Sequence, residues 1–66
     1  MRIDRQKFYL RCAELAVNPV DVAKKAGLCV ETVYKATAGG NVTTKTVGKV
    51  ALALEIEPKN LILSEG

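Results

Sequence analysis

The sequence contains no histidine, and this absence removes several kinds of chemistry. Without an imidazole, the chain cannot assemble a Ser/His or Cys/His nucleophile or offer a histidine ligand to a metal. Cysteine is scarce as well, because Cys12 and Cys29 are too few for a structural zinc site or a disulfide-stapled scaffold. Acid/base pairs and glycine-rich phosphate loops are also missing. We therefore expect no metal, no cofactor and no enzymatic activity.

Long apolar runs are missing too. No stretch of ~18 apolar residues and no signal peptide is present, so we expect no membrane partner and a cytoplasmic protein with reduced thiols. What remains is a chain of 66 residues with 48% hydrophobic and 26% charged residues, a composition typical of a folded domain. A single domain over residues 1–66 is the expected organisation.

Basic residues are unevenly distributed. Residues 1–49 carry nine lysines and arginines against four acids, a net charge of +5. Residues 50–66 carry one lysine against three glutamates, a net charge of −2. The overall charge of +3 therefore conceals a basic segment that favours a polyanionic partner.

Apolar spacing is helical through most of the chain. Phe8, Cys12 and Leu15 follow the i, i+4, i+7 pattern of one helix face and predict a first helix over about residues 4–16. The Asn18-Pro19 pair ends it and begins a second helix, 19–26, because Asn is a good N-cap and Pro suits the first helical position.

The second half of the chain shows the same helical character. Gly27 follows the second helix as a left-handed turn residue, and a third helix is expected over 30–37. A fourth begins at Thr43 or Thr44, and Pro58 opens a short fifth. Gly48 within the fourth helix suggests a close helix crossing. The expected fold is an all-α, compact five-helix bundle.

The segment 19–37 meets the requirements of a helix-turn-helix. Ala23 is small where two crossed helices touch, Gly27 provides the turn, and Val33 wedges between the helices. In such a unit the first helix braces across the DNA backbone and the second enters the major groove.

The sequence here resembles the lambda Cro/repressor-type, or XRE-like, helix-turn-helix family. Residues 21–28 are similar to the family's bracing helix, and residues 46–61 are similar to its fourth and fifth helices. Pro19 stands where many members place a phosphate-binding glutamine, so that contact must be made elsewhere. Residues 41–44 resemble a subgroup of regulators from phages and mobile elements, which implies a prokaryotic, nucleoid-associated protein.

Carried over position by position, the resemblance makes the exposed face of the third helix the base-reading surface. Lys35 is suited to donate to guanine, Glu31 to accept from cytosine, and the Val30 methyls to meet thymine. Tyr34 is suited to bond a phosphate or stack on sugar, and Thr32 shares the face. Alternatively, Lys35 is a solvated lysine and Glu31 only favours the helix macrodipole.

Phosphate contacts form a second expected group, which positions the protein without reading sequence. Its candidates are Asn18, Lys24, Cys29, Asn41, Thr43, Thr44 and Lys45. Simple helix capping is the alternative role for both threonines. Cys29 is alternatively a redox-sensitive thiol, whereas Cys12 is expected in the core. Lys7 and Arg11 fit a solvated face better than a DNA contact.

The expected function is that of a sequence-specific regulator of transcription, repressor-like, that binds double-stranded DNA. A unit of this size favours a homodimer on a pseudo-palindromic operator. Dimer contacts are expected from the tail, near Ile56, Leu61, Ile62 and Leu63, or only on DNA. The alternative is an antitoxin-like or adaptor protein-interaction module that binds DNA weakly or not at all.

Overall fold

The computed structural model describes residues 1–63, and its elements are four α-helices and a single 3₁₀ turn. The helices are α1 (Arg5–Leu15), α2 (Pro19–Ala26), α3 (Val30–Thr37) and α4 (Thr44–Ala53). The 3₁₀ turn, η1 (Pro58–Asn60), stands where we expected a fifth helix. In this turn Asn60 N donates to the Glu57 carbonyl and Leu61 N donates to the Pro58 carbonyl. These bonds join residues three apart, as in a 3₁₀ helix, and such helices are short.

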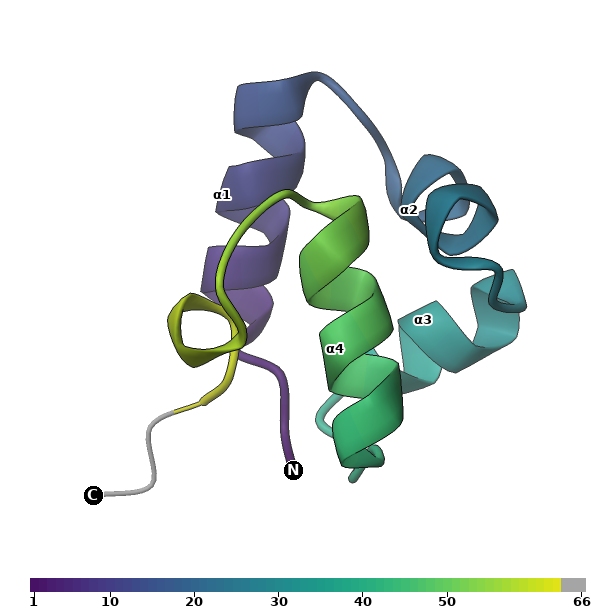
Figure 1. The fold of residues 1–66 in the computed structure, drawn as a ribbon, viewed down its shortest axis with the longest axis vertical. Helices are drawn as coiled ribbons and strands as arrows, with labels where there is room; N and C mark the ends of the chain where they lie inside the picture. Colours follow the sequence, from purple (N-terminus) through teal and green to yellow (C-terminus); the bar gives the residue numbers. More distant parts are fainter. Residues whose placement is uncertain (64–66) are drawn as a thin grey trace.

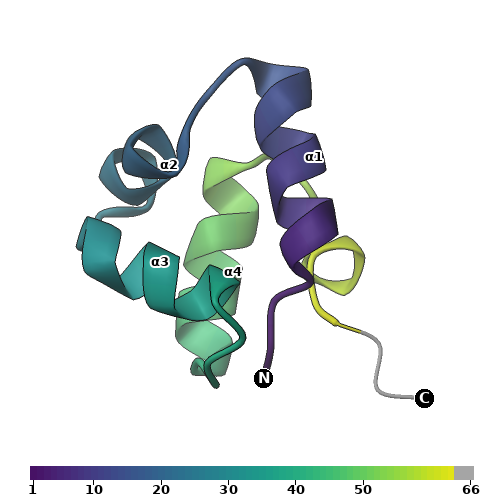
Figure 2. The same ribbon diagram turned by 180° about the vertical axis from the view of Figure 1, so that it is seen from behind.

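Helices α1 and α4 lie side by side and run in the same direction, while α2 and α3 cross each other beside α4 (Figures 1 and 2). Each helix contributes its apolar face to one central core. The largest fully buried side chains are Phe8, Val22, Val33, Val47, Val50, Leu54 and Leu61. This core holds the α2–α3 pair at a defined angle, which leaves the outer face of α3 exposed.

The first residues of the chain pair with two distant segments. Ile3 and Ile62 form an isolated antiparallel bridge, in which Asp4 N donates to the Leu61 carbonyl at 2.8 Å. On the other side, Val42 N donates to the Met1 carbonyl at 2.8 Å. These long-range backbone bonds escaped prediction because the sequence shows no strand pattern there. They tie the α3–α4 loop to the C-terminal tail.

Arg11 corrects the expectation of a solvated side chain. Its Nε donates to the Leu54 carbonyl at 2.8 Å, and a terminal nitrogen donates to the Glu55 carbonyl at 3.3 Å. These carbonyls end α4, where unpaired acceptors and the negative end of the macrodipole attract a cation. Arg11 therefore joins α1 to the C-terminus of α4.

Two further expectations about packing need correction. Outside its own helical turn, Gly48 has no heavy atom of residues 1–63 within 4 Å of the position that a Cβ would occupy, so it permits no close crossing within this chain. Leu61, expected at a dimer contact, is completely buried in the core because η1 turns it inward. It is therefore unavailable to a second copy.

Candidate nucleic-acid interface

The bracing helix α2 begins with a complete capping box. Asn18 Oδ1 accepts from Asp21 N at 2.9 Å, and Asp21 Oδ2 accepts from Asn18 N at 3.1 Å. Asn18 is exposed, and Lys24 is exposed on the outer side of the same helix. The capping box fixes the Asn18 side chain at the start of α2, with its amide nitrogen left to reach a ligand.

The turn between α2 and α3 has the geometry that the sequence indicates. Gly27 adopts φ 69°, and Leu28 N donates to the Ala23 carbonyl at 2.9 Å to close the turn. Ala23 and Val33 are 2% and 1% exposed, so the two helices meet through a small and a β-branched side chain. The structure therefore places Ala23, Gly27 and Val33 as a helix-turn-helix requires.

The outer face of α3 carries the expected base-reading residues at different degrees of exposure. Glu31, Tyr34 and Lys35 are exposed, with Tyr34 at 48%. Thr32 is half-buried, and Val30 is half-buried because it packs against the core. All five thus lie on one helix, but only Glu31, Tyr34 and Lys35 have exposed side chains.

The N-terminus of α3 opens onto solvent at Cys29. This residue is the N-cap, is exposed, and within the described chain makes no side-chain capping bond. Thr32 N and Val33 N bond back to the Cys29 carbonyl, at 3.0 and 3.4 Å. The first helical amides, those of Val30 and Glu31, precede these bonds, and such amides at a helix N-terminus are the groups that bind phosphates.

The loop from α3 to α4 is shaped by Gly40. A Cβ on Gly40 would lie 2.9 Å from the Lys35 carbonyl oxygen, so only glycine allows the chain to turn back so tightly against α3. Gly40 N donates to that same carbonyl at 3.2 Å. The loop therefore brings Asn41, which is exposed, next to the C-terminal end of α3.

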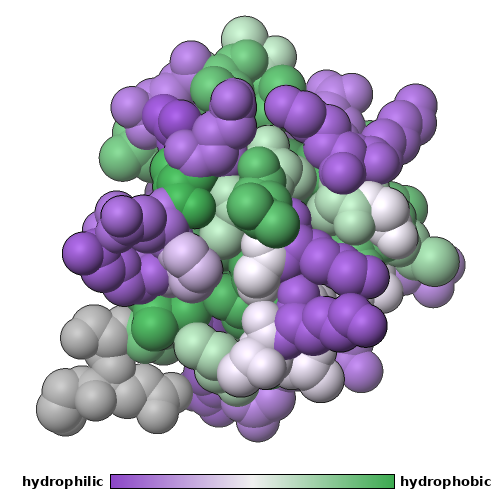
Figure 3. Space-filling view, viewed as in Figure 1, coloured by the Kyte–Doolittle hydropathy of each residue, from purple (hydrophilic) through white to green (hydrophobic). Residues whose placement is uncertain are grey.

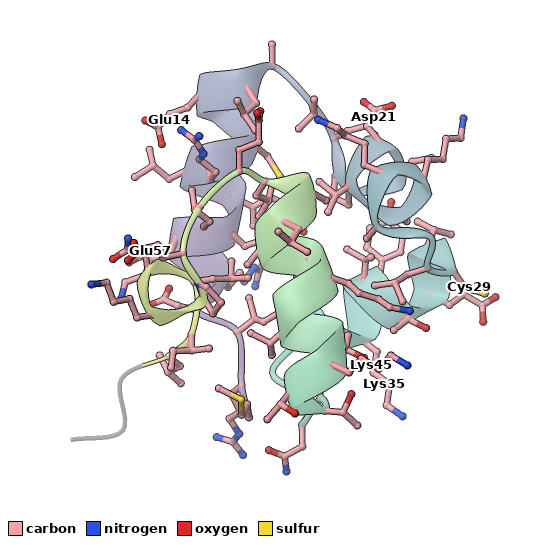
Figure 4. All side chains as sticks on the ribbon, in the orientation of Figure 1. Glu14, Asp21, Cys29, Lys35, Lys45 and Glu57 are labelled. Atoms are coloured by element: carbon pink, nitrogen blue, oxygen red, sulfur yellow. The ribbon has the colours of Figure 1, made fainter. Side chains whose placement is uncertain are left out.

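The start of α4 completes this surface. Thr43 is the N-cap, and its Oγ1 accepts from Thr46 N at 3.2 Å. Thr44 and Lys45 follow, both exposed. In Figure 4, Lys45 and Lys35 lie together at one corner of the molecule, with Cys29 on the same side, whereas Glu14 and Glu57 lie on the opposite side. Asp21 also lies on the Cys29 side, and Lys59 pairs with Glu57, so charges of both signs occur on both sides.

The cysteines have separate environments. Cys12 is 3% exposed within the core, and this burial raises the pKa of its thiol. Cys29 is exposed. Cys12 is therefore a core residue, as its position on the apolar face of α1 indicated.

Other kinds of site find no support in the described part of the chain. Residues 1–63 include no group of three or more His, Cys, Asp or Glu side chains placed to hold a metal ion. Over the same residues, every helix falls short of the length and apolarity needed to cross a membrane.

Comparison with known proteins begins with two negative results. No family model matches the chain, and no curated protein matches it either. Solved structures do match. The restriction-modification controller protein C.AhdI from Aeromonas hydrophila aligns at 26% identity and a TM-score of 0.77, over 85% of this chain and 86% of that protein. This match confirms the resemblance to Cro/repressor-type helix-turn-helix proteins.

A second group of matches shows the fold alone. Hydroxyethylphosphonate dioxygenase, as its Y98F mutant, aligns over the whole of this chain at 23% identity and a TM-score of 0.84. Native PhpD with cadmium aligns at 23% identity and a TM-score of 0.83. This chain spans 14% of the length of each of those chains. The four-helix unit therefore occurs both as most of a small controller and as a small part of a larger enzyme.

Proposed function

We propose that this chain, which shares the fold and the turn motif of Cro/repressor-type helix-turn-helix proteins, binds double-stranded DNA in the cytoplasm and regulates transcription. The observation that carries the proposal is the exposed outer face of α3, which is held outward by the buried Ala23 and Val33 side chains between α2 and α3. The likeness to a controller protein of nearly equal length supports it. Repression is the form of regulation that we propose.

Lys35 is the residue to which we assign most of the base discrimination. It is exposed in the last turn of α3, and a lysine there is suited to donate to the O6 and N7 of guanine. Glu31 lies one turn earlier on the same face, where a carboxylate is suited to accept from cytosine N4. Tyr34, exposed beside Lys35, is assigned to sugar or phosphate.

Val30 and Thr32 have a smaller role in this proposal. Because both are half-buried, only part of each side chain can reach a base edge. A methyl group from either is suited to contact a thymine methyl at the entrance of the groove. In this proposal the two side chains contribute van der Waals contacts at the start of α3 rather than hydrogen bonds.

The phosphate contacts are proposed to come from three helix starts and from the last turn of α2. The group comprises Asn18 and Lys24 on α2, Cys29 before α3, and Asn41, Thr43, Thr44 and Lys45 before and within the first turn of α4. All seven are exposed. Such contacts set register and supply most of the salt-dependent affinity.

A pair of copies on a pseudo-palindromic operator completes the proposal. One unit covers little DNA, and two units about one helical turn apart would each place α3 in the major groove on the same side of the duplex. Each half-site adds its own contacts, so the pair binds far more tightly than a single unit.

Replacement of Lys35 tests the base-reading assignment. Lys35→Ala should reduce discrimination at one base pair of the bound sequence by about 1–3 kcal/mol, measured by fluorescence anisotropy on matched and single-substituted duplexes. Lys59→Ala is the matched control, because Lys59 is exposed in η1 and pairs with Glu57 at 3.1 Å. An equal loss on every duplex would make Lys35 a phosphate contact instead.

A further inference from the structure

A shallow, open depression lies on the outer face of α1, away from the proposed DNA-binding surface. Its walls are the side chains of Arg5, Gln6, Tyr9 and Leu10. Arg5 and Tyr9 are four residues apart, as are Gln6 and Leu10, so the depression is the groove between two adjacent rows of side chains on one helix. Figures 1 and 2 place α1 on the opposite side of α4 from α2 and α3. The groove and the outer face of α3 are therefore separate surfaces.

The apolar walls of the groove are exposed and held in place. Leu10 is 64% exposed and Tyr9 is 39% exposed, and Ala13, also exposed, follows Tyr9 by one turn. The Tyr9 ring packs at 88° to the buried Phe8 ring, with centroids 5.3 Å apart. On its other side, the Arg5 guanidinium carbon lies 5.8 Å from the Tyr9 centroid, a cation–π distance. The Tyr9 ring is thus fixed between two neighbours, and the groove exists before any ligand binds.

Apolar exposure alone does not distinguish α1 from the rest of the surface. Leu52 on α4 is 81% exposed. Figure 3 shows apolar side chains at the centre of the view, over the C-terminal half of α4. Single exposed apolar side chains are common on soluble proteins. The distinguishing feature of α1 is that two adjacent apolar side chains line a groove together with a cation.

Charge beside the groove is basic at the N-terminal end of α1. Arg5 and Lys7 are exposed in the first turn, which contains no acidic residue, although the helix macrodipole disfavours cations there. The Asp4 carboxylate is already engaged, because its Oδ1 accepts from Gln6 N and Lys7 N at 2.9 and 3.2 Å. Within residues 1–63, neither Arg5 nor Lys7 forms an ion pair. A carboxylate from another molecule would therefore be attracted by both cations and by the helix dipole.

We infer that this groove binds an acidic, amphipathic helix of a partner protein. An apolar side chain of that helix fits between Tyr9 and Leu10, and carboxylates beside it pair with Arg5 and Lys7. Phosphates would use the two cations but gain nothing from a groove lined by leucine. An acidic amphipathic helix uses the cations and the apolar walls together, so the groove favours a protein over a nucleic acid.

Docking at α1 deepens the proposed function, and its regulatory role rests on that function. Because α1 and α3 lie on opposite sides of α4, one molecule can hold DNA and the partner at the same time (Figure 2). A regulator that does so brings the partner protein to the bound DNA. Binding of the acidic helix itself does not require DNA.

Selection from a displayed library of random peptides on the full chain tests the groove. The peptides are about 16 residues long, which is enough for a helix to form. Enriched peptides should combine Asp or Glu with Leu, Ile or Phe at helical spacing. Arg5→Ala and Leu10→Ser should each raise the Kd of these peptides at least about fivefold, measured by fluorescence anisotropy.

Two exposed side chains elsewhere provide matched controls. Leu52→Ser removes an exposed leucine from α4, and Lys35→Ala removes an exposed cation from α3, so both should leave the Kd of the peptides unchanged. Circular dichroism spectra that match wild type establish that each variant is folded. Failure to enrich acidic peptides overturns the inference, as does equal binding of the enriched peptides to wild type, Arg5→Ala and Leu10→Ser.

Binding to a duplex of random sequence at physiological salt separates this inference from the proposed function. Arg5→Ala and Leu10→Ser should bind the duplex as wild type does, because both changes lie away from α3. A lower duplex affinity of Arg5→Ala, without enrichment of acidic peptides, would make this end of α1 a DNA contact and overturn the inference. Acidic peptides that bind the α1 groove of a wild type unable to bind DNA support the groove and contradict the proposed function.

Discussion

At the scale of single residues, the Arg11 side chain connects α1 to the C-terminal end of α4. Its guanidinium donates to two carbonyls at the end of α4, and Glu14 lies 4.0 Å away on its own helix. Arg11→Met retains most of the apolar stem but leaves those carbonyls without a cationic donor. We expect the free energy of unfolding to fall by about 1–3 kcal/mol, measured by urea denaturation.

Lys7→Met is the matched control for that measurement. Lys7 is exposed on the same helix and its side chain makes no hydrogen bond or ion pair within the described residues. Its replacement should change the free energy of unfolding by less than ~0.5 kcal/mol. Equal effects of the two changes would mean that the Arg11 contacts contribute nothing to stability.

The two thiols offer a second residue-scale prediction. Alkylation proceeds through the thiolate, and burial raises the pKa of Cys12, so less thiolate is present there at any pH below that value. Iodoacetamide at pH 8 should therefore modify Cys29 in the folded protein and modify Cys12 only after unfolding. Mass spectrometry after a timed reaction distinguishes the two sites, and rapid modification of both would contradict the buried position of Cys12.

At the residue scale, sequence reasoning succeeds where local spacing decides the outcome. The capping pair Asn18 and Asp21, the left-handed Gly27 and the buried Cys12 all follow from their neighbours in the chain. Arg11 was misplaced because its partners are more than 40 residues away. The direct contacts of the α3 side chains with DNA stay predictions.

At the scale of elements, α4 contains a glycine, Gly48, whose role in the helix can be tested by substitution. Alanine is favoured over glycine within a helix by ~1 kcal/mol, and the space beside Gly48 accepts a methyl group. Gly48→Ala should therefore raise the free energy of unfolding by up to ~1 kcal/mol. Thermal and urea denaturation measure the change.

Gly39→Ala is the opposing control for the same experiment. Gly39 adopts φ 97°, a conformation that a residue with a Cβ rarely takes, so its replacement should destabilise the fold. Destabilisation by Gly48→Ala as well would show that Gly48 is required within the single chain.

Helix boundaries were well predicted because helix capping depends on residues that are close together in the sequence. The expected ranges of α2 and α3 coincide with those observed, and Thr43 caps α4 as anticipated. The fifth helix became a 3₁₀ turn because long-range pairing of Ile62 with Ile3 draws the chain into an extended path. No periodicity in the sequence reports such pairing.

At the scale of the whole molecule, the fold brings lysines from α3 and α4 together. Lys35 and Lys45 lie together on the side of Cys29, and Glu14 and Glu57 lie on the other (Figure 4). The bond from Val42 N to the Met1 carbonyl and the bridge between Ile3 and Ile62 fix the loop before α4 to the tail. The corner where Lys35 and Lys45 lie together is thus where we expect a polyanion to bind.

Selection of bound duplexes from a random DNA pool at physiological salt tests the central claim most directly. We predict enrichment of a pseudo-palindromic sequence whose affinity falls with salt at a log–log slope of about −0.9 for each phosphate neutralised. Failure to enrich any sequence, together with an affinity insensitive to salt, would contradict DNA reading by α3 and favour a protein-interaction module.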